Sequence, residues 1–227
     1  MSASYAIQRT PAALGSPDLA DDTLWAAAEV APVTHFTWED SGHRPDVRGH
    51  LLYDEKWLAV RFDVKDRYVR AVAEKFNDSV CSDSCVEFFV APSEDPAENA
   101  YFNFEVNCGG TMLLHACPST SQALAGANSV HVSEEDGELI RMAATLPKIV
   151  EPELTDPTDW SVEYHVPWSL FEKYFDVAPP EPGLIWRGNF YKCGDRTSHP
   201  HWGSWSPVDT PRPSFHQPDF YQPLRFA

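Results

Sequence analysis

The sequence predicts an all-β fold, an antiparallel β-sandwich of the jelly-roll or immunoglobulin-like kind with one or two short helices. Three observations predict it. Short segments rich in aromatic and β-branched residues recur along the 227 residues, turns containing Pro, Asp and Gly separate them, and one segment only has a convincing helical period. Evenly spaced short strands with turns between them are typical of two packed sheets.

Eight segments are expected as strands: residues 49–53, 57–64, 86–90, 101–107, 111–115, 139–145, 160–166 and 185–192. In the second of them, Leu58, Val60, Phe62 and Val64 alternate with residues of the other face, as in a half-buried strand. The short connection between the first two segments predicts a hairpin.

The one helical segment begins at Pro167, a residue that suits the first turn of a helix. Trp168, Phe171 and Tyr174 then recur at a spacing of three, which places them on one side of the helix. A shorter turn is expected near Trp25. Four tryptophans are expected in the core: Trp25, Trp160, Trp168 and Trp186.

Length and composition favour one domain over residues 21–227, preceded by a surface arm over residues 1–20 that is rich in Ala, Ser and Pro. The formal net charge of −17 argues against nucleic acid or an anionic membrane as a partner. No secretory signal and no apolar stretch of membrane-spanning length is visible, so we expect either a cytoplasmic protein or a sequence that begins after processing.

The five cysteines are odd in number, lack CxxC spacing and are too sparse for a disulfide scaffold. We therefore expect reduced, mostly buried thiols at Cys81, Cys85, Cys108, Cys117 and Cys193.

Two neighbouring segments carry the main functional signal. Residues 83–90 (DSCVEFFV) and 101–107 (YFNFEVN) read as strands, but they place Glu87, Glu105 and Asn107 among aromatic residues. Planar polar groups beside aromatic rings suit a pyranose, which has apolar C–H faces and a girdle of hydroxyls.

Seven motifs in order resemble the family 9 carbohydrate-binding modules: DxxW at 22–25, LYDxxWLAV at 52–60, DSCVEFF at 83–89, NFEVNCxG at 103–110, WxVExxVPW at 160–168, WRxNFY at 186–191, and WSP at 205–207 leading to FHxPxF at 215–220. The resemblance implies a β-sandwich that binds sugars without cleaving them, with structural Ca²⁺ in some members. It implies that Glu87 and Asn107 contact the sugar and that Phe215 replaces one of two clamping tryptophans.

The chain departs from this family pattern at two positions. Glu105 stands where an Arg is expected, and the other clamping tryptophan is missing near Val80 or Cys81. Other residues could complete the surface, so the predicted sugar-binding set is Glu87, Asn107, Arg187, Tyr191, Phe215 and Trp202.

Several alternatives stay open. Glu87 and Glu105 could form the carboxylate pair of a glycoside hydrolase, and a haem-binding sandwich of the DOMON type could use Met112 or Met142 with His115, His131 or His165. The sugar site could also have decayed and left an interaction domain. Carboxylates at Asp63, Asp66, Asp78 and Asp83 are candidate Ca²⁺ ligands, and His199, His201, His216 and Asp195 are candidate Zn²⁺ ligands.

Overall fold

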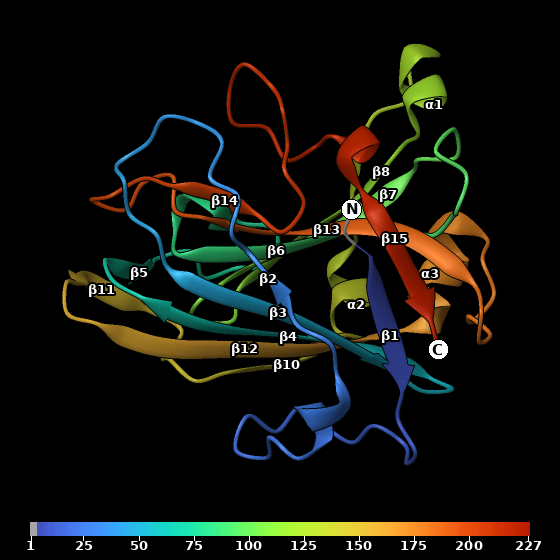
Figure 1. Ribbon diagram of the computed structural model, residues 1–227, viewed down its shortest axis with the longest axis horizontal. Helices are drawn as coiled ribbons and strands as arrows, with labels where there is room; N and C mark the ends of the chain where they lie inside the picture. Colours follow the sequence, from blue (N-terminus) through green and yellow to red (C-terminus); the bar gives the residue numbers. More distant parts are fainter. Residues whose placement is uncertain (1–3) are drawn as a thin grey trace.

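The computed structural model describes residues 4–227, and its strands are arranged in two layers that face each other (Figure 1). The strands are β1 (Tyr5–Arg9), β2 (Ala31–Pro32), β3 (Asp46–Tyr53), β4 (Trp57–Asp66), β5 (Val69–Ala71), β6 (Cys85–Ala91), β7 (Tyr101–Asn107), β8 (Met112–Cys117), β9 (Val130–His131), β10 (Arg141–Ala144), β11 (Val150–Leu154), β12 (Thr158–Pro167), β13 (Ile185–Cys193), β14 (Trp202–Ser204) and β15 (Gln222–Phe226). Each of the eight segments expected as strands overlaps a strand of the structure.

One long, curled sheet supplies both layers, in the order β10-β12-β4-β3-β1-β15-β13-β6-β7-β8-β9, with β2 beside β3 and β14 beside β13. We call the part from β10 to β3 the back layer and the part from β15 to β9, with β14, the front layer. A separate small sheet pairs β5 with β11. The sandwich-like, mostly β architecture is therefore as predicted.

The strictly antiparallel arrangement was a wrong expectation. Strand β1 lies between the layers in the sheet order and pairs in parallel with both β15 and β3. Its Tyr5 and Ile7 are buried, so part of the expected arm, residues 1–20, is a central strand; residues 1–3 lie outside the described residues. Strand β1 is short and is followed by turn-forming residues, so its two buried positions do not stand out as a strand pattern in the sequence.

The main core fills the space between the layers, where the side chains of one face of each strand meet. Phe88 and Phe190 of the front layer pack there at a ring distance of 5.0 Å, and Phe62 of the back layer approaches Phe190 at 5.9 Å. Trp25, Trp160, Trp168 and Trp186 are all buried, as expected.

The helices are short: α1 (Thr120–Leu124), α2 (Glu134–Gly137) and α3 (Trp168–Phe175), with 3₁₀ turns η1 (Leu24–Ala27), η2 (Val80–Ser82) and η3 (Pro218–Phe220). Helix α3 matches the predicted helical segment and buries Trp168 and Phe171. Among the described residues, none of these helices has the length and apolar character needed to cross a membrane.

Candidate functional site

The candidate site lies on the outer face of the front layer, because alternate residues of a strand point to opposite sides of a sheet. Val86, Phe88 and Val90 of β6 face the main core. Cys85 and Phe89 belong to a second apolar cluster, which the chain after β13 covers with Val208, Phe215 and Tyr221. Glu87 shares the face of Cys85 and Phe89, so its carboxylate lies under this C-terminal covering segment.

A cavity of about 240 Å³ opens between the front layer and the covering segment. Its lining residues come from η2, from the four strands β6, β7, β13 and β14, and from the irregular segments after β13: Cys81, Glu87, Glu105, Cys193, Asp195, Trp202, Pro213, Ser214, Phe215 and His216. The cavity is slightly smaller than the range of about 300–1,000 Å³ usual for small-ligand sites, so it suits a ligand no larger than about one sugar ring.

Two carboxylates form part of the cavity floor. Glu87 of β6 and Glu105 of β7 are directly opposite each other in the antiparallel pair, and their residues are only 3% and 6% exposed. Burial and the nearby Glu105 charge raise the pKa of Glu87 well above its ordinary value. Burial also raises the pKa of Glu105 to about 7, although the hydrogen bond from Asn103 opposes the shift.

Aromatic side chains form part of the cavity wall. The half-buried Trp202 on β14 donates its indole N–H to Asp195 Oδ1 over 2.7 Å, which fixes the ring orientation. Phe215 stacks on Tyr191 at a ring distance of 4.2 Å. The cavity therefore combines an acidic floor with two aromatic rings whose neighbours hold them in place.

The structure brings together three residues of the predicted sugar-binding set, Glu87, Trp202 and Phe215. It also places Cys81 and Glu105 in the same cavity, and these are the positions where the sequence departs from the family pattern. Tyr191 is fully buried beneath Phe215 and donates its hydroxyl to the Phe215 carbonyl. Tyr191 thus supports the wall without lining the cavity.

Asn107 and Arg187 are not among the lining residues of this cavity, and their contact with a sugar stays a prediction. Asn107 is fully buried, and its side-chain N–H donates a hydrogen bond to Asp83 Oδ2 over 2.9 Å. Its side-chain oxygen Oδ1 accepts hydrogen bonds from the backbone N–H groups of Gly109 and Thr111. Arg187 donates to the Tyr221 carbonyl over 3.0 Å. Both side chains have backbone partners that a strand pattern alone does not reveal.

Sequence reasoning missed Asp195, Cys193, Ser214 and His216 as members of this site. Asp195 and His216 were considered only as zinc ligands, and they lie in irregular segments without a periodic signal. His216 is held by the Tyr101 hydroxyl at 2.8 Å. Burial lowers the pKa of His216, so the imidazole is neutral near pH 7.

The four aspartates predicted to bind Ca²⁺ do not form a shared site. Asp63 is bonded to Arg61 and Ser161, Asp78 accepts the N–H groups of Glu74 and Lys75, and Asp83 accepts those of Val72 and Ala73. Each carboxylate already accepts internal N–H or O–H groups, whereas a Ca²⁺ site gathers oxygen ligands around one ion. Calcium binding itself stays a prediction.

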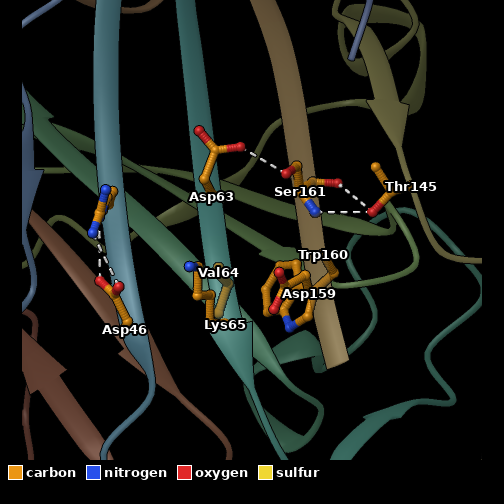
Figure 2. A pocket seen from close by; sticks show the side chains of 9 residues that line it. Asp46, Asp63, Val64, Lys65, Thr145, Asp159, Trp160 and Ser161 are labelled. Atoms are coloured by element: carbon orange, nitrogen blue, oxygen red, sulfur yellow. Dashed lines mark hydrogen bonds and ion pairs between the residues drawn. The ribbon is translucent and has the colours of Figure 1, made fainter. Parts of the chain in front are cut away.

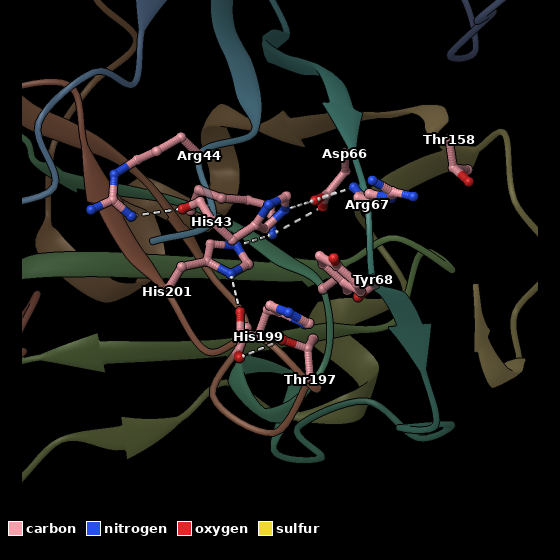
Figure 3. A network of polar contacts seen from close by, with 12 residues as sticks. His43, Arg44, Asp66, Arg67, Tyr68, Thr158, Thr197, His199 and His201 are labelled. Atoms are coloured by element: carbon pink, nitrogen blue, oxygen red, sulfur yellow. Dashed lines mark hydrogen bonds and ion pairs between the residues drawn. The ribbon is translucent and has the colours of Figure 1, made fainter. Parts of the chain in front are cut away.

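The fourth aspartate, Asp66, belongs to a buried polar network (Figure 3). Its Oδ1 lies 2.7 Å from His43 Nε2, and its Oδ2 lies 3.3 Å from the Lys192 ammonium. Lys192 is also 2.9 Å from His201 Nε2. The lysine ammonium therefore lies where a metal bound by His43, Asp66 and His201 would be expected.

The predicted zinc set is not brought together around one point. His199 stacks on Tyr68 at 3.5 Å, whereas His201 faces Lys192 and His216 faces Tyr101. Asp195 is bonded to Trp202 instead.

A second hollow, of about 300 Å³, lies on the outer face of the back layer (Figure 2). Asp63 and Ser161 are hydrogen-bonded there at 2.7 Å, and Ser161 also bonds to Thr145. The hollow contains charged residues such as Asp46 and Lys65, but its one aromatic residue, Trp160, is 2% exposed. It therefore offers little ring surface for a sugar to stack on.

Several proteins of known structure have a similar fold. A proposed carbohydrate-binding protein from Bacteroides uniformis has a similar structure, with 29% identity, a TM-score of 0.85 and 99% of each chain covered. A family 9 module from Caldicellulosiruptor kristjanssonii in complex with cellotriose shares 13% identity and a TM-score of 0.62, over 97% of this chain and 93% of the other. For a family 9 module from the same organism in complex with glucose, the identity is 13% and the TM-score 0.61, over 98% of this chain and 95% of the other.

Among curated proteins, none matches the chain significantly. The sequence profile of carbohydrate-binding family 9 matches residues 19–226, nearly the whole chain. This match and the shared fold agree with the resemblance that the seven sequence motifs indicated, and the chain belongs to carbohydrate-binding family 9.

Proposed function

We propose that this protein binds a mono- or oligosaccharide, without cleaving it, in the cavity between the front layer and the C-terminal covering segment. The observation that carries the proposal is the meeting of Glu87, Trp202 and Phe215 in one cavity of about 240 Å³. Membership of a carbohydrate-binding family supports it, as do the glucose and cellotriose complexes of the module from C. kristjanssonii.

Each part of the cavity has a chemical role in this proposal. Trp202 and Phe215 stack against the C–H faces of a sugar ring. The pKa of Glu105 is raised to about 7. Its carboxyl group accepts a hydrogen bond from a sugar hydroxyl when ionised and donates one to a sugar hydroxyl when protonated. Because few groups make contact and the cavity is open to water, we expect a Kd between about 1 mM and 1 μM.

The arrangement of the carboxylates favours binding over hydrolysis. A glycosidase needs its two carboxyl groups on opposite sides of the scissile bond, about 5 to 10 Å apart. Glu87 and Glu105 are direct cross-strand neighbours on one surface, so both approach a ligand from the same side. A glycosidic bond bound in the cavity would then have carboxyl groups on one side only.

Isothermal titration calorimetry with glucose, cellobiose and cellotriose tests the proposal. Trp202→Ala removes one wall and is expected to weaken binding about five- to thirtyfold, or about 1–2 kcal/mol. The matched control is Trp57→Ala, a half-buried tryptophan of the back layer that packs beneath Arg141 at 4.2 Å. Equal losses in the two variants, or the absence of binding to a broad glycan array, would contradict the proposal.

A further inference from the structure

A cluster of two thiols and a carboxylate lies at the inner edge of the cavity. Cys85 of β6 and Cys193 of β13 are directly opposite each other in the antiparallel pair. Glu87 follows Cys85 by two residues, so alternation brings its side chain to the same face. One ligand atom from each of the three residues lies within 4.8 Å of the other two.

We propose that Cys85, Cys193 and Glu87 form a binding site for a thiophilic divalent cation such as Zn²⁺. Two thiolates and a carboxylate are an accepted ligand set for this ion, with Zn–S bonds of about 2.3 Å and Zn–O bonds of about 2.0–2.2 Å. A tetrahedral ion with such bonds holds two sulfur atoms about 3.8 Å apart. The observed spacing therefore needs only small side-chain movements to surround one ion.

The strands make this site rigid. Cys85 and Cys193 form the last pair of the β6–β13 ladder, Glu87 lies two residues further into β6, and all three are buried. The Cys193 thiol already donates to Glu87 Oε1 over 3.1 Å. A metal would replace the thiol proton in this contact, so the ligands are oriented toward one another before the ion arrives.

Solvent can reach the site, and the carboxylate there lacks a cationic partner. Cys193 and Glu87 line the cavity, which supplies an entry path and room for a water or for Glu105 as a fourth ligand. Glu87 is nine-tenths buried or more, and its one hydrogen-bond donor among the described residues is a thiol. A divalent cation would give this carboxylate a positive partner, while the two protons released by the thiols keep the net charge of the site unchanged.

Binding follows a simple balance. One Zn²⁺ forms bonds to two sulfur atoms and one carboxylate oxygen, and it displaces one proton from each of the Cys85 and Cys193 thiols together with any proton held by Glu87. No electron is transferred. Burial raises the pKa of Cys85 to about 12, so the free protein keeps both protons and the apparent affinity increases with pH.

The other metal-like group in the described part of the chain, His43 with Asp66 and His201, does not compete with this site. The Lys192 ammonium lies 3.3 Å from Asp66 Oδ2 and 2.9 Å from His201 Nε2. It already neutralises that group, whereas no cationic side chain is bonded to Glu87 among the described residues.

The test uses the full chain, reduced and freed of metal, and titrates it with Co²⁺ and Zn²⁺. We expect one Co²⁺ per chain with thiolate-to-metal charge-transfer absorption, displacement of Co²⁺ by Zn²⁺, and release of about two protons per ion. Cys85→Ser and Cys193→Ser should each lower the absorption, and Glu87→Gln should weaken binding at least about tenfold. Cys108→Ser is the matched control, since this buried thiol contacts the Arg70 carbonyl instead.

Circular dichroism and urea unfolding show whether each variant is folded. If a cysteine variant fails to fold, the near-isosteric Glu87→Gln and the Zn²⁺-dependent increase in Tm of the unchanged protein decide the outcome. The proposal is overturned if the reduced protein binds no stoichiometric Co²⁺ or Zn²⁺, if Cys108→Ser alters the spectrum as much as Cys193→Ser, or if mass spectrometry finds Cys85 and Cys193 joined as a disulfide that reductant does not open.

Discussion

Removal of the Lys192 ammonium by Lys192→Met should be among the most destabilising single changes in this protein. Lys192 and Asp66 are both fully buried, and Nζ lies 3.3 Å from Oδ2. Methionine retains an unbranched chain but removes the ammonium charge and leaves Asp66 with three contacts, from His43, the Arg67 N–H and the Trp160 indole N–H.

Breaking a buried ion pair by removal of one partner costs about 3–5 kcal/mol. Because three hydrogen-bonding contacts to Asp66 remain, we expect the lower end of this range, about 3 kcal/mol. Urea unfolding at pH 7 measures it: the midpoint should fall while the slope of free energy against urea stays unchanged. The double variant Lys192→Met with Asp66→Asn no longer buries an unpaired charge and should recover at least about 1 kcal/mol. A loss below about 1 kcal/mol, or no recovery in the double variant, would refute this reasoning.

Two further predictions concern stability. First, the contribution of His201 to the free energy of unfolding should decrease as the pH falls below 6.5, because burial and the Lys192 charge lower its pKa to about 3 and the unfolded chain binds the proton before the folded one does. The raised pKa values of Glu87 and Glu105 act in the opposite direction, so the test compares the protein with a variant that lacks His201. Below pH 3.8 a second loss should follow, because Lys192 and His43 hold the pKa of Asp66 well below its ordinary value even though burial alone would raise it. Urea unfolding of the unchanged protein and of His201→Gln at pH 7, 5.5, 4 and 3 isolates the contribution, and a stability difference between the two that does not change with pH would count against it. Second, Gly49→Ala should cost about 1–3 kcal/mol, because its Cβ would lie 2.5 Å from Phe190 Cδ1. The control is Gly15→Ala, where nothing lies within 4 Å of the added atom, and similar unfolding midpoints for the two variants would show that the Gly49 contact is unimportant.

Much of the fold could be predicted because the buried apolar residues of this chain recur with the two-residue period of a strand. Strand β4 alternates as expected, with Leu58, Val60, Phe62 and Val64 in the main core. Helix α3 follows its threefold aromatic spacing. The parallel strand β1 could not be predicted in the same way, since its partners β3 and β15 lie about 40 and 220 residues away in the sequence, and no local pattern specifies such pairing.

The candidate site was predictable only in part. Glu87 stands out in sequence as a carboxylate within an apolar strand, and the structure places it in the cavity. Asn107 has the same kind of signal but faces Asp83 and backbone groups. The difference depends on which loop covers each position, and the covering segment around Ser214 and His216 has no regular period. Register across β6, β7 and β13 likewise decides that Cys85, Cys193 and Glu105 join Glu87.

A crystal structure with cellotriose or glucose bound tests the central claim most directly. Our account predicts electron density for a sugar ring in the cavity, in contact with Trp202 and Phe215 and hydrogen-bonded to Glu87 or Glu105. Density for the sugar in the hollow beside Ser161 and Thr145 (Figure 2), with the cavity empty at saturating ligand, would contradict the account.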